Sequence, residues 1–233
     1  DKPDAARDVL YKVLKAVPDH MPSVLLAGAV DLRLGSYYQS EQYFRRYLER
    51  NPANVYARKM LAQALIGSGH ADDARAVLET MLDARQLDAQ VLGLAADADM
   101  LSHRFSQAAE LFARASALDT ASASLRTGLG LSRLGEGATN DAVRQLQAAT
   151  TLDKNSLEAG EALVQADLRL GRRDAALDAA LALEHTQPGK PLVHALKGQV
   201  LAAQGKPDAA RASFEQALAL DPSYYRAPAG LSQ

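Results

Sequence analysis

The sequence predicts an all-α protein: a right-handed α-solenoid of stacked antiparallel helix pairs with a 34-residue period. The clearest observation is a phrase that occurs near both ends of the chain, DKPDAARDVL from Asp1 and GKPDAARASF from Gly205. Its lysines, Lys2 and Lys206, lie 204 residues apart, which is six times 34, and a fixed period of this length is typical of stacked helical repeats. Composition agrees, because 48% of residues are hydrophobic and only 5% aromatic, which favours close-packed helices over sheets.

The turn inside each unit is predicted from a column of glycines. Glycine adopts a left-handed backbone at little cost and therefore commonly follows the end of a helix. The first helix of each unit should end near this column, and the second should begin just after it. Five of the six positions are glycine: Gly35, Gly69, His103, Gly137, Gly171 and Gly205.

Two further columns predict the packed face of the second helix. Residues four apart share one helix face, so a small residue lets the partner helix approach and a large one, four positions later, fills the gap. The small residues are Ala6, Ser40, Ala74, Ala108, Ala142, Ala176 and Ala210, and the large column is Leu10, Phe44, Leu78, Phe112, Leu146, Ala180 and Phe214. Proline then ends the helix; it stands at Pro18, Pro52, Pro188 and Pro222 and is missing at Gln86, Thr120 and Lys154.

This pattern of helix, Gly turn, Ala, Leu or Phe, and Pro resembles the tetratricopeptide repeat (TPR). The resemblance implies one TPR superhelix over residues 1–233, with thirteen helices and a short terminal one. Because Asp1 opens inside the repeated phrase, we expect the chain to be a fragment of a longer protein. The implied units are a partial repeat 1–20, full repeats 21–54, 55–88, 89–122, 123–156, 157–190 and 191–224, and a partial repeat 225–233.

The chain departs from this family at two positions of the first helix. The family's usual Trp is replaced by Val24, Arg58, Leu92, Arg126, Gly160 and His194. Its usual Tyr, seven residues later, is replaced by Asp31, Leu65, Asp99, Arg133, Asp167 and Leu201. We interpret the four charged residues of the second set as exposed or half-buried contacts between repeats, and such contacts contribute about 0–1 kcal/mol each.

Two longer phrases resemble a particular branch of the family. PLVHALKGQVLAAQGKPDAARASFEQALALDPSYYRAPAGL and, before it, DLRLGRRDAALDAALALEHTQPGKP are similar to the TPR-repeat lipoproteins of the PEP-CTERM/exosortase system. The resemblance implies a periplasmic array, anchored at its N-terminus by lipid and, in the full-length protein, held at the outer membrane. It also implies a role with machinery for exopolysaccharide export and protein sorting. A cytosolic TPR adaptor or co-chaperone-like peptide-binding module is the alternative.

Composition and spacing indicate a non-catalytic protein. The net charge is −2, and no long run of Lys and Arg is present to attract nucleic acid. There is no Cys, and no two of the five His stand four apart as metal ligands on one helix would. The segment GLGLSRLGEG lacks the third Gly of a dinucleotide loop, since Arg133 replaces it. We therefore predict no catalytic, cofactor-binding or metal-binding residue, no membrane span, and protein or peptide partners that include export-machinery components.

The first-helix positions that line the inner surface of the family predict a concave binding surface. It carries no single strong charge, so an extended peptide or a partner helix suits it, although scaffolding without a ligand is equally compatible. A carboxylate clamp of the family's kind is incomplete, because Gln90 and Leu94 stand where a second basic pair would be. The predicted surface is Tyr56, Lys59, Gln63, Gln90, Asp97, Met100, Glu158, Glu161, Gln165, Arg169 and Gln199.

An aromatic cluster predicts a second contact patch. Half of the eight tyrosines fall within eleven residues, at Tyr37, Tyr38, Tyr43 and Tyr47, around Phe44. Tyrosine is enriched at interfaces because it offers rigid area with a polar tip. Phe44 belongs to the core by its register, and packing within one hairpin is the alternative for the tyrosines.

Overall fold

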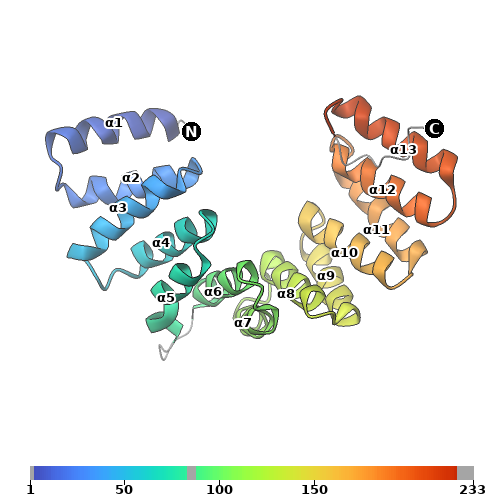
Figure 1. Ribbon diagram of the computed structural model, residues 1–233, viewed down its shortest axis with the longest axis horizontal. Coiled ribbons are helices and arrows are strands. Elements are labelled where there is room, and N and C mark those ends of the chain that lie inside the picture. The colour runs from blue at the N-terminus through green and yellow to red at the C-terminus, as the bar shows by residue number, and fades with distance from the viewer. Residues whose placement is uncertain (1–2, 83–87, 225–233) are drawn as a thin grey trace. The chain divides into compact units, whose positions relative to one another are not determined.

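The computed structural model describes residues 3–82 and 88–224, and these residues form thirteen α-helices and no strand (Figure 1). The predicted all-α architecture of stacked helix pairs is confirmed. The partial repeat 225–233 and Gln86 lie outside the described residues.

The chain divides into two compact units, residues 1–118 and 119–233, each of which is described by itself. The boundary follows the last residue of the second helix in the predicted repeat 89–122. The continuity of a single array across it stays a prediction. Unit 1 contains α1 (Pro3–Ala16), α2 (Met21–Arg33), α3 (Tyr37–Arg50), α4 (Val55–Gly67), α5 (Ala71–Leu82), α6 (Ala89–Leu101) and α7 (Phe105–Leu118). Unit 2 contains α8 (Ala123–Gly135), α9 (Thr139–Leu152), α10 (Leu157–Arg169), α11 (Arg173–Thr186), α12 (Pro191–Ala203) and α13 (Pro207–Leu220).

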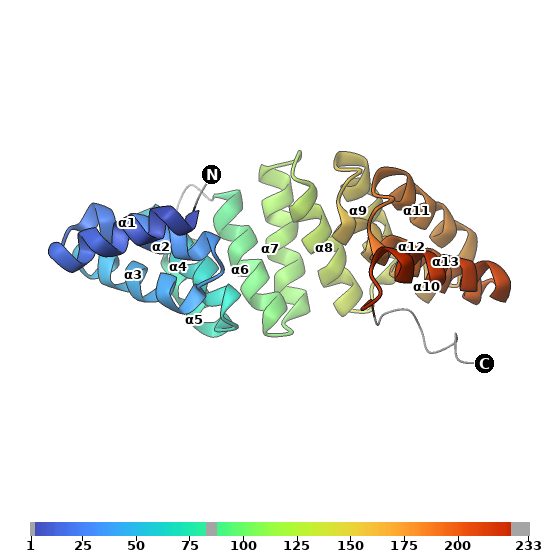
Figure 2. The ribbon, with the colours of Figure 1, turned by 90° about the horizontal axis from the view of Figure 1, so that it is seen from above.

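Within each unit the first helices of successive repeats stack on one another. In unit 1, α4 contacts both α2 and α6, and in unit 2, α10 contacts both α8 and α12, while each first helix also packs on its own second helix. Figure 2 shows the helices of a unit side by side. One hairpin alone leaves its apolar face exposed, so this stacking completes each core.

The turns follow the predicted column closely. Five glycines of the column have φ between +71° and +83°, and His103, at the sixth position, has φ +57°. A residue with a Cβ is strained in this left-handed region. The position therefore requires the left-handed turn whichever residue occupies it.

Small and large residues meet at the helix contacts as predicted. Ala74, Ala108 and Ala142 are completely buried, and Ala210 is 3% exposed. A methyl group added at Gly130 would lie 2.6 Å from Leu146 Cγ, so a side chain there would push the two helices of the pair apart.

One expectation was wrong: the three aspartates at the Tyr position are buried, with Asp31 at 0% and Asp99 and Asp167 at 2% exposure. The position faces the stacking interface, where the equivalent Leu65 is also fully buried. Arg133, at the same position, is partly exposed and pairs with Glu136 of its own repeat at 2.7 Å.

The three buried carboxylates have different partners. Asp31 accepts a hydrogen bond from Tyr11 Oη at 3.0 Å. Asp99 accepts one from Arg104 Nε at 2.8 Å and lies 3.6 Å from Arg75 Nε of the preceding repeat. Oδ1 of Asp167 has no hydrogen bond, and its nearest cation is Arg172, 3.9 Å away. Burial raises the pKa of Asp167 against the opposing effect of Arg172.

Candidate interaction surfaces

In unit 1 the predicted concave surface is built around a lysine that bridges two repeats. Lys59 Nζ on α4 donates to Asp88 Oδ2 at 3.0 Å and to Gln90 Oε1 at 2.7 Å, at the start of α6. Burial acts to raise the pKa of Asp88, but hydrogen bonds from Lys59 and from backbone N–H groups outweigh it, and the pKa is lowered. The Lys59 side chain is only 16% exposed. A ligand anion at this point would have to displace an existing ion pair.

Around this bridge the surface is open but mixed. Tyr56 is 48% exposed, Asp97 is exposed, and Gln63 and Met100 are half-buried. Leu94, the position at which a clamp would need a second basic residue, is buried at 7% exposure. The unit therefore offers an aromatic ring among polar groups rather than a carboxylate clamp.

In unit 2 the predicted surface residues lie on α10 and α12. Gln165 Nε2 donates to Gln199 Oε1 at 3.1 Å, so these two amides join neighbouring first helices. Glu158 and Arg169 are exposed and Glu161 is half-buried. The side chains of Glu158, Glu161 and Arg169 give this surface both signs of charge.

The four tyrosines of the aromatic cluster have different environments. Tyr43 and Tyr47 pack against the core of Leu14, Val24 and Ala27. Tyr37 lies against α4, where its ring would be 2.5 Å from a methyl group at Gly67. Tyr38, in contrast, is 64% exposed. Contact with a partner through this cluster stays a prediction, and Tyr38 is its most accessible member.

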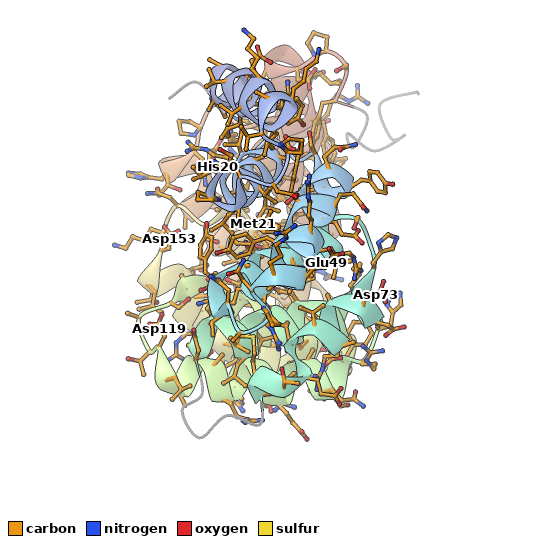
Figure 3. All side chains as sticks on the ribbon, turned by 90° about the vertical axis from the view of Figure 1, so that its left-hand side faces the viewer. His20, Met21, Glu49, Asp73, Asp119 and Asp153 are labelled. Carbon is orange, nitrogen blue, oxygen red and sulfur yellow. The ribbon has the colours of Figure 1, made fainter. Side chains whose placement is uncertain are left out.

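The two long edges of unit 1 carry polar turns. Figure 3 shows His20, at the turn before α2, and Asp73, near the start of α5, on opposite sides of the unit. His20 Nδ1 lies 2.8 Å from Ser23 Oγ, and Asp73 lies 3.9 Å from Arg45. The His20 contact stays at the start of α2, whereas the Asp73 contact joins α5 to α3.

A groove in unit 2 was not anticipated from the sequence. It has a volume of about 430 Å³ and opens among the end of α9, the start of α10 and the second half of α11. Its apolar lining comes from Gly160, Leu163, Ala179, Ala182 and Leu183. The signal that could have revealed it is Gly160, which stands where the family places a tryptophan.

Metal ligation and membrane insertion find no support in the part of the chain that the structure describes. No group of three or more His, Asp or Glu side chains there could hold a metal ion. No helix among those residues is both long and apolar enough to span a bilayer. His194, one of the two histidines on helices, is 7% exposed, and its Nε2 lies 2.7 Å from the Pro188 carbonyl oxygen, which is the environment of a packed core residue.

The stacked hairpins can now be compared with known families. Models of the tetratricopeptide repeat match residues 31–98 and 191–224. These segments are tetratricopeptide repeats. No protein of curated function matches the sequence.

Solved structures share the fold at low sequence identity. The APC/C hetero-tetramer Cut9–Hcn1 contains a chain that is 19% identical with a TM-score of 0.75; the alignment covers 97% of our chain but only 45% of that one. Thus our chain spans less than half the length of that relative. YrrB, described as a TPR protein with an unusual peptide-binding site, is 20% identical with a TM-score of 0.62. The alignment covers 79% of our chain and 95% of YrrB. A thermophilic TPR protein of Thermus thermophilus is 21% identical with a TM-score of 0.65. The alignment covers 78% of our chain and 99% of that protein.

Proposed function

We propose that this chain is a non-catalytic protein–protein interaction scaffold of a bacterial periplasmic assembly for exopolysaccharide or protein export. The TPR fold itself indicates a scaffold with protein or peptide partners. The export setting is supported by the resemblance of residues 167–231 to the TPR-repeat lipoproteins of the PEP-CTERM/exosortase system.

The observation that carries the proposal is the exposed aromatic residue on the stacked first helices of unit 1. Tyr56 exposes 48% of its surface on α4, beside the Lys59 bridge that holds α4 to α6. An exposed aromatic ring above a fixed backbone offers a partner contact area with little loss of conformational freedom. We expect Tyr56 to contribute to the binding of an extended peptide or a partner helix.

The co-chaperone alternative has less support. A carboxylate clamp needs free cationic groups on neighbouring first helices. Lys59 is already paired with Asp88, and Leu94 is buried. The two positions that would supply the second basic pair, Gln90 and Leu94, therefore offer no cation for a terminal carboxylate.

Affinity capture from a bacterial envelope extract tests the proposal, with the chain as bait. We expect Tyr56→Ala to reduce recovery of export-machinery proteins and to leave the helical circular dichroism unchanged. Tyr38→Ala is a matched control on a second helix, because Tyr38 is also an exposed tyrosine. If only Tyr38→Ala reduces recovery, the aromatic cluster is the working surface instead.

Cell fractionation of the full-length protein tests the compartment separately. We expect it in the envelope fraction, attached to the outer membrane through lipid. A purely cytosolic full-length protein would refute the export setting and leave the interaction scaffold alone.

A further inference from the structure

The groove among α9, α10 and α11 exists because one repeat lacks a side chain that others supply. Arg58 stands at the equivalent position three 34-residue units before Gly160. It donates to the Pro52 carbonyl oxygen at 2.9 Å and to Thr80 Oγ1 at 2.6 Å. His194, one period after Gly160, places Nε2 2.7 Å from the Pro188 carbonyl oxygen. In both repeats the side chain runs along the helix pair to the preceding loop.

At Gly160 no side chain follows this path, and Leu183 fills the place where a Cβ would stand. Pro52 and Pro188 both correspond by the 34-residue register to Lys154, whose carbonyl oxygen accepts instead from Thr186 Oγ1 at 3.3 Å. The helix contact below the groove stays closed, because a methyl group at Gly160 would be 2.5 Å from Leu183. The groove therefore opens beyond Leu183, toward Lys154 and Ala182, above an intact core.

The groove is apolar inside and basic at its edge. The charged or titratable side chains that line it are Lys154 and His185, and no carboxylate does. Lys154 is exposed and forms no ion pair with any described residue. The hydroxyls of Thr150 and Thr151 donate to the Gln147 carbonyl oxygen, so the free donors at the edge are those of Lys154 and His185.

We propose that this groove binds an acidic peptide segment through one apolar anchor: a leucine-sized or phenylalanine-sized side chain enters between Leu163 and Leu183, and a neighbouring carboxylate faces Lys154 and His185. A side chain fits because Lys154 and Ala182 line the groove, and they correspond by the 34-residue register to Pro52 and Thr80, which the Arg58 side chain reaches. A volume of about 430 Å³ is within the usual range of small binding pockets and too small for a whole helix. The absence of any carboxylate from the lining favours an anionic partner.

This site is separate from the concave surface of the proposed function. It is built from α9 and α11, which are second helices, together with the start of α10. Loss of binding here and loss of envelope capture through Tyr56 are therefore distinguishable outcomes. Either can fail without the other.

The probe is a fluorescein-labelled, terminally blocked peptide, Gly-Glu-Leu-Glu-Gly, measured by fluorescence anisotropy. We expect binding that weakens as salt rises, because the edge charges are exposed to solvent. Lys154→Glu should weaken it by about tenfold or more, equivalent to about 1.4 kcal/mol. Ala182→Trp, which places a large ring in the groove from an exposed position, should abolish binding.

Two matched controls lie elsewhere in unit 2. Lys190→Glu reverses an exposed charge outside the groove, and Ala219→Trp adds the same ring at an exposed position of α13; both should bind the probe normally. Peptides with Lys for Glu, or Ala for Leu, should not bind to the unaltered protein. Equal binding by Lys154→Glu and Ala182→Trp, or no binding at millimolar peptide, would overturn the proposal. So would binding of decanoate without binding of the peptide, because the occupant would then be a fatty acid.

Discussion

Replacing Asp167 by leucine should stabilise the protein. The carboxyl is 2% exposed, Oδ1 has no hydrogen bond, and Arg172 lies 3.9 Å away. The equivalent positions of two other repeats hold Leu65 and Leu201, which are 0% and 8% exposed, so the fold accommodates leucine there. Replacing a buried, poorly paired charge by a well-packed apolar residue typically stabilises by about 1–4 kcal/mol.

Urea unfolding at pH 7, followed by circular dichroism, measures this change. Asp99→Leu is the matched control, because it removes an equally buried carboxylate that Arg104 and Arg75 hold at 2.8 and 3.6 Å. We expect this control to destabilise, since Arg75 loses its carboxylate contact and Arg104 keeps only Asp72, at 2.8 Å. If Asp167→Leu destabilises as much as the control does, Asp167 is well compensated in the fold and the reasoning is refuted.

The buried Asp167 should also change how the free energy of unfolding depends on pH. Burial raises the pKa of Asp167 above its ordinary value of 3.8, so the folded state holds this proton to a higher pH than the unfolded state. The contribution of Asp167 to the free energy of unfolding therefore falls as pH rises from about 4 through the folded-state pKa. Asp167→Asn should remove this part of the pH dependence. An identical pH profile for the two proteins would contradict it.

Three other substitutions test the packing. His103→Gly should stabilise by about 1 kcal/mol in thermal or urea unfolding, because φ +57° is strained for a residue with a Cβ; destabilisation would mean that the edge contact of His103 with the Phe105 ring outweighs the strain. Ala108→Leu should overpack a completely buried site and destabilise by about 1–3 kcal/mol, and an unchanged melting curve would count against the register. Tyr11→Phe should destabilise by about 1–3 kcal/mol, because the fully buried Asp31 loses its hydrogen bond. Burial and then the interactions with Asp31 raise the pKa of Tyr11 to about 12, so the substitution should also remove one phenol from the ultraviolet titration near pH 12. A free energy of unfolding equal to that of the unaltered protein would show that water replaces the phenol.

The helices and turns could be predicted from the sequence because they depend on neighbours in the chain. A residue every 34 positions must adopt a left-handed backbone, and glycine does so most easily. The turns at Gly35 and Gly69 could therefore be predicted from the sequence. Even the exception at His103 kept the turn. The small and large columns were equally readable, since residues four apart meet on one helix face whatever the rest of the fold does.

The environments of single polar residues could not be predicted in this way. Lys59 looked like an available ligand group, and only the packing of α4 beside α6 places Asp88 and Gln90 against it. For the four tyrosines near Phe44, the sequence left a contact patch and packing within one hairpin equally open. In the structure Tyr43 and Tyr47 pack on a core cluster, and Tyr37 lies against α4 while it stays 37% exposed. Each outcome depends on a residue from another helix.

By itself, the sequence determined the period, the order of the helices and the apolar face of each, because these follow from local backbone preference and from spacing along one helix. Tertiary structure alone decided which aspartates are buried, which cations are paired and where a groove opens. Asp99 and Asp167 occupy identical positions in their repeats, yet one has two guanidinium groups around it and the other a single distant one. The physical reason is that burial and electrostatics are set by distances of a few ångströms between helices, and the repeat pattern does not encode those distances.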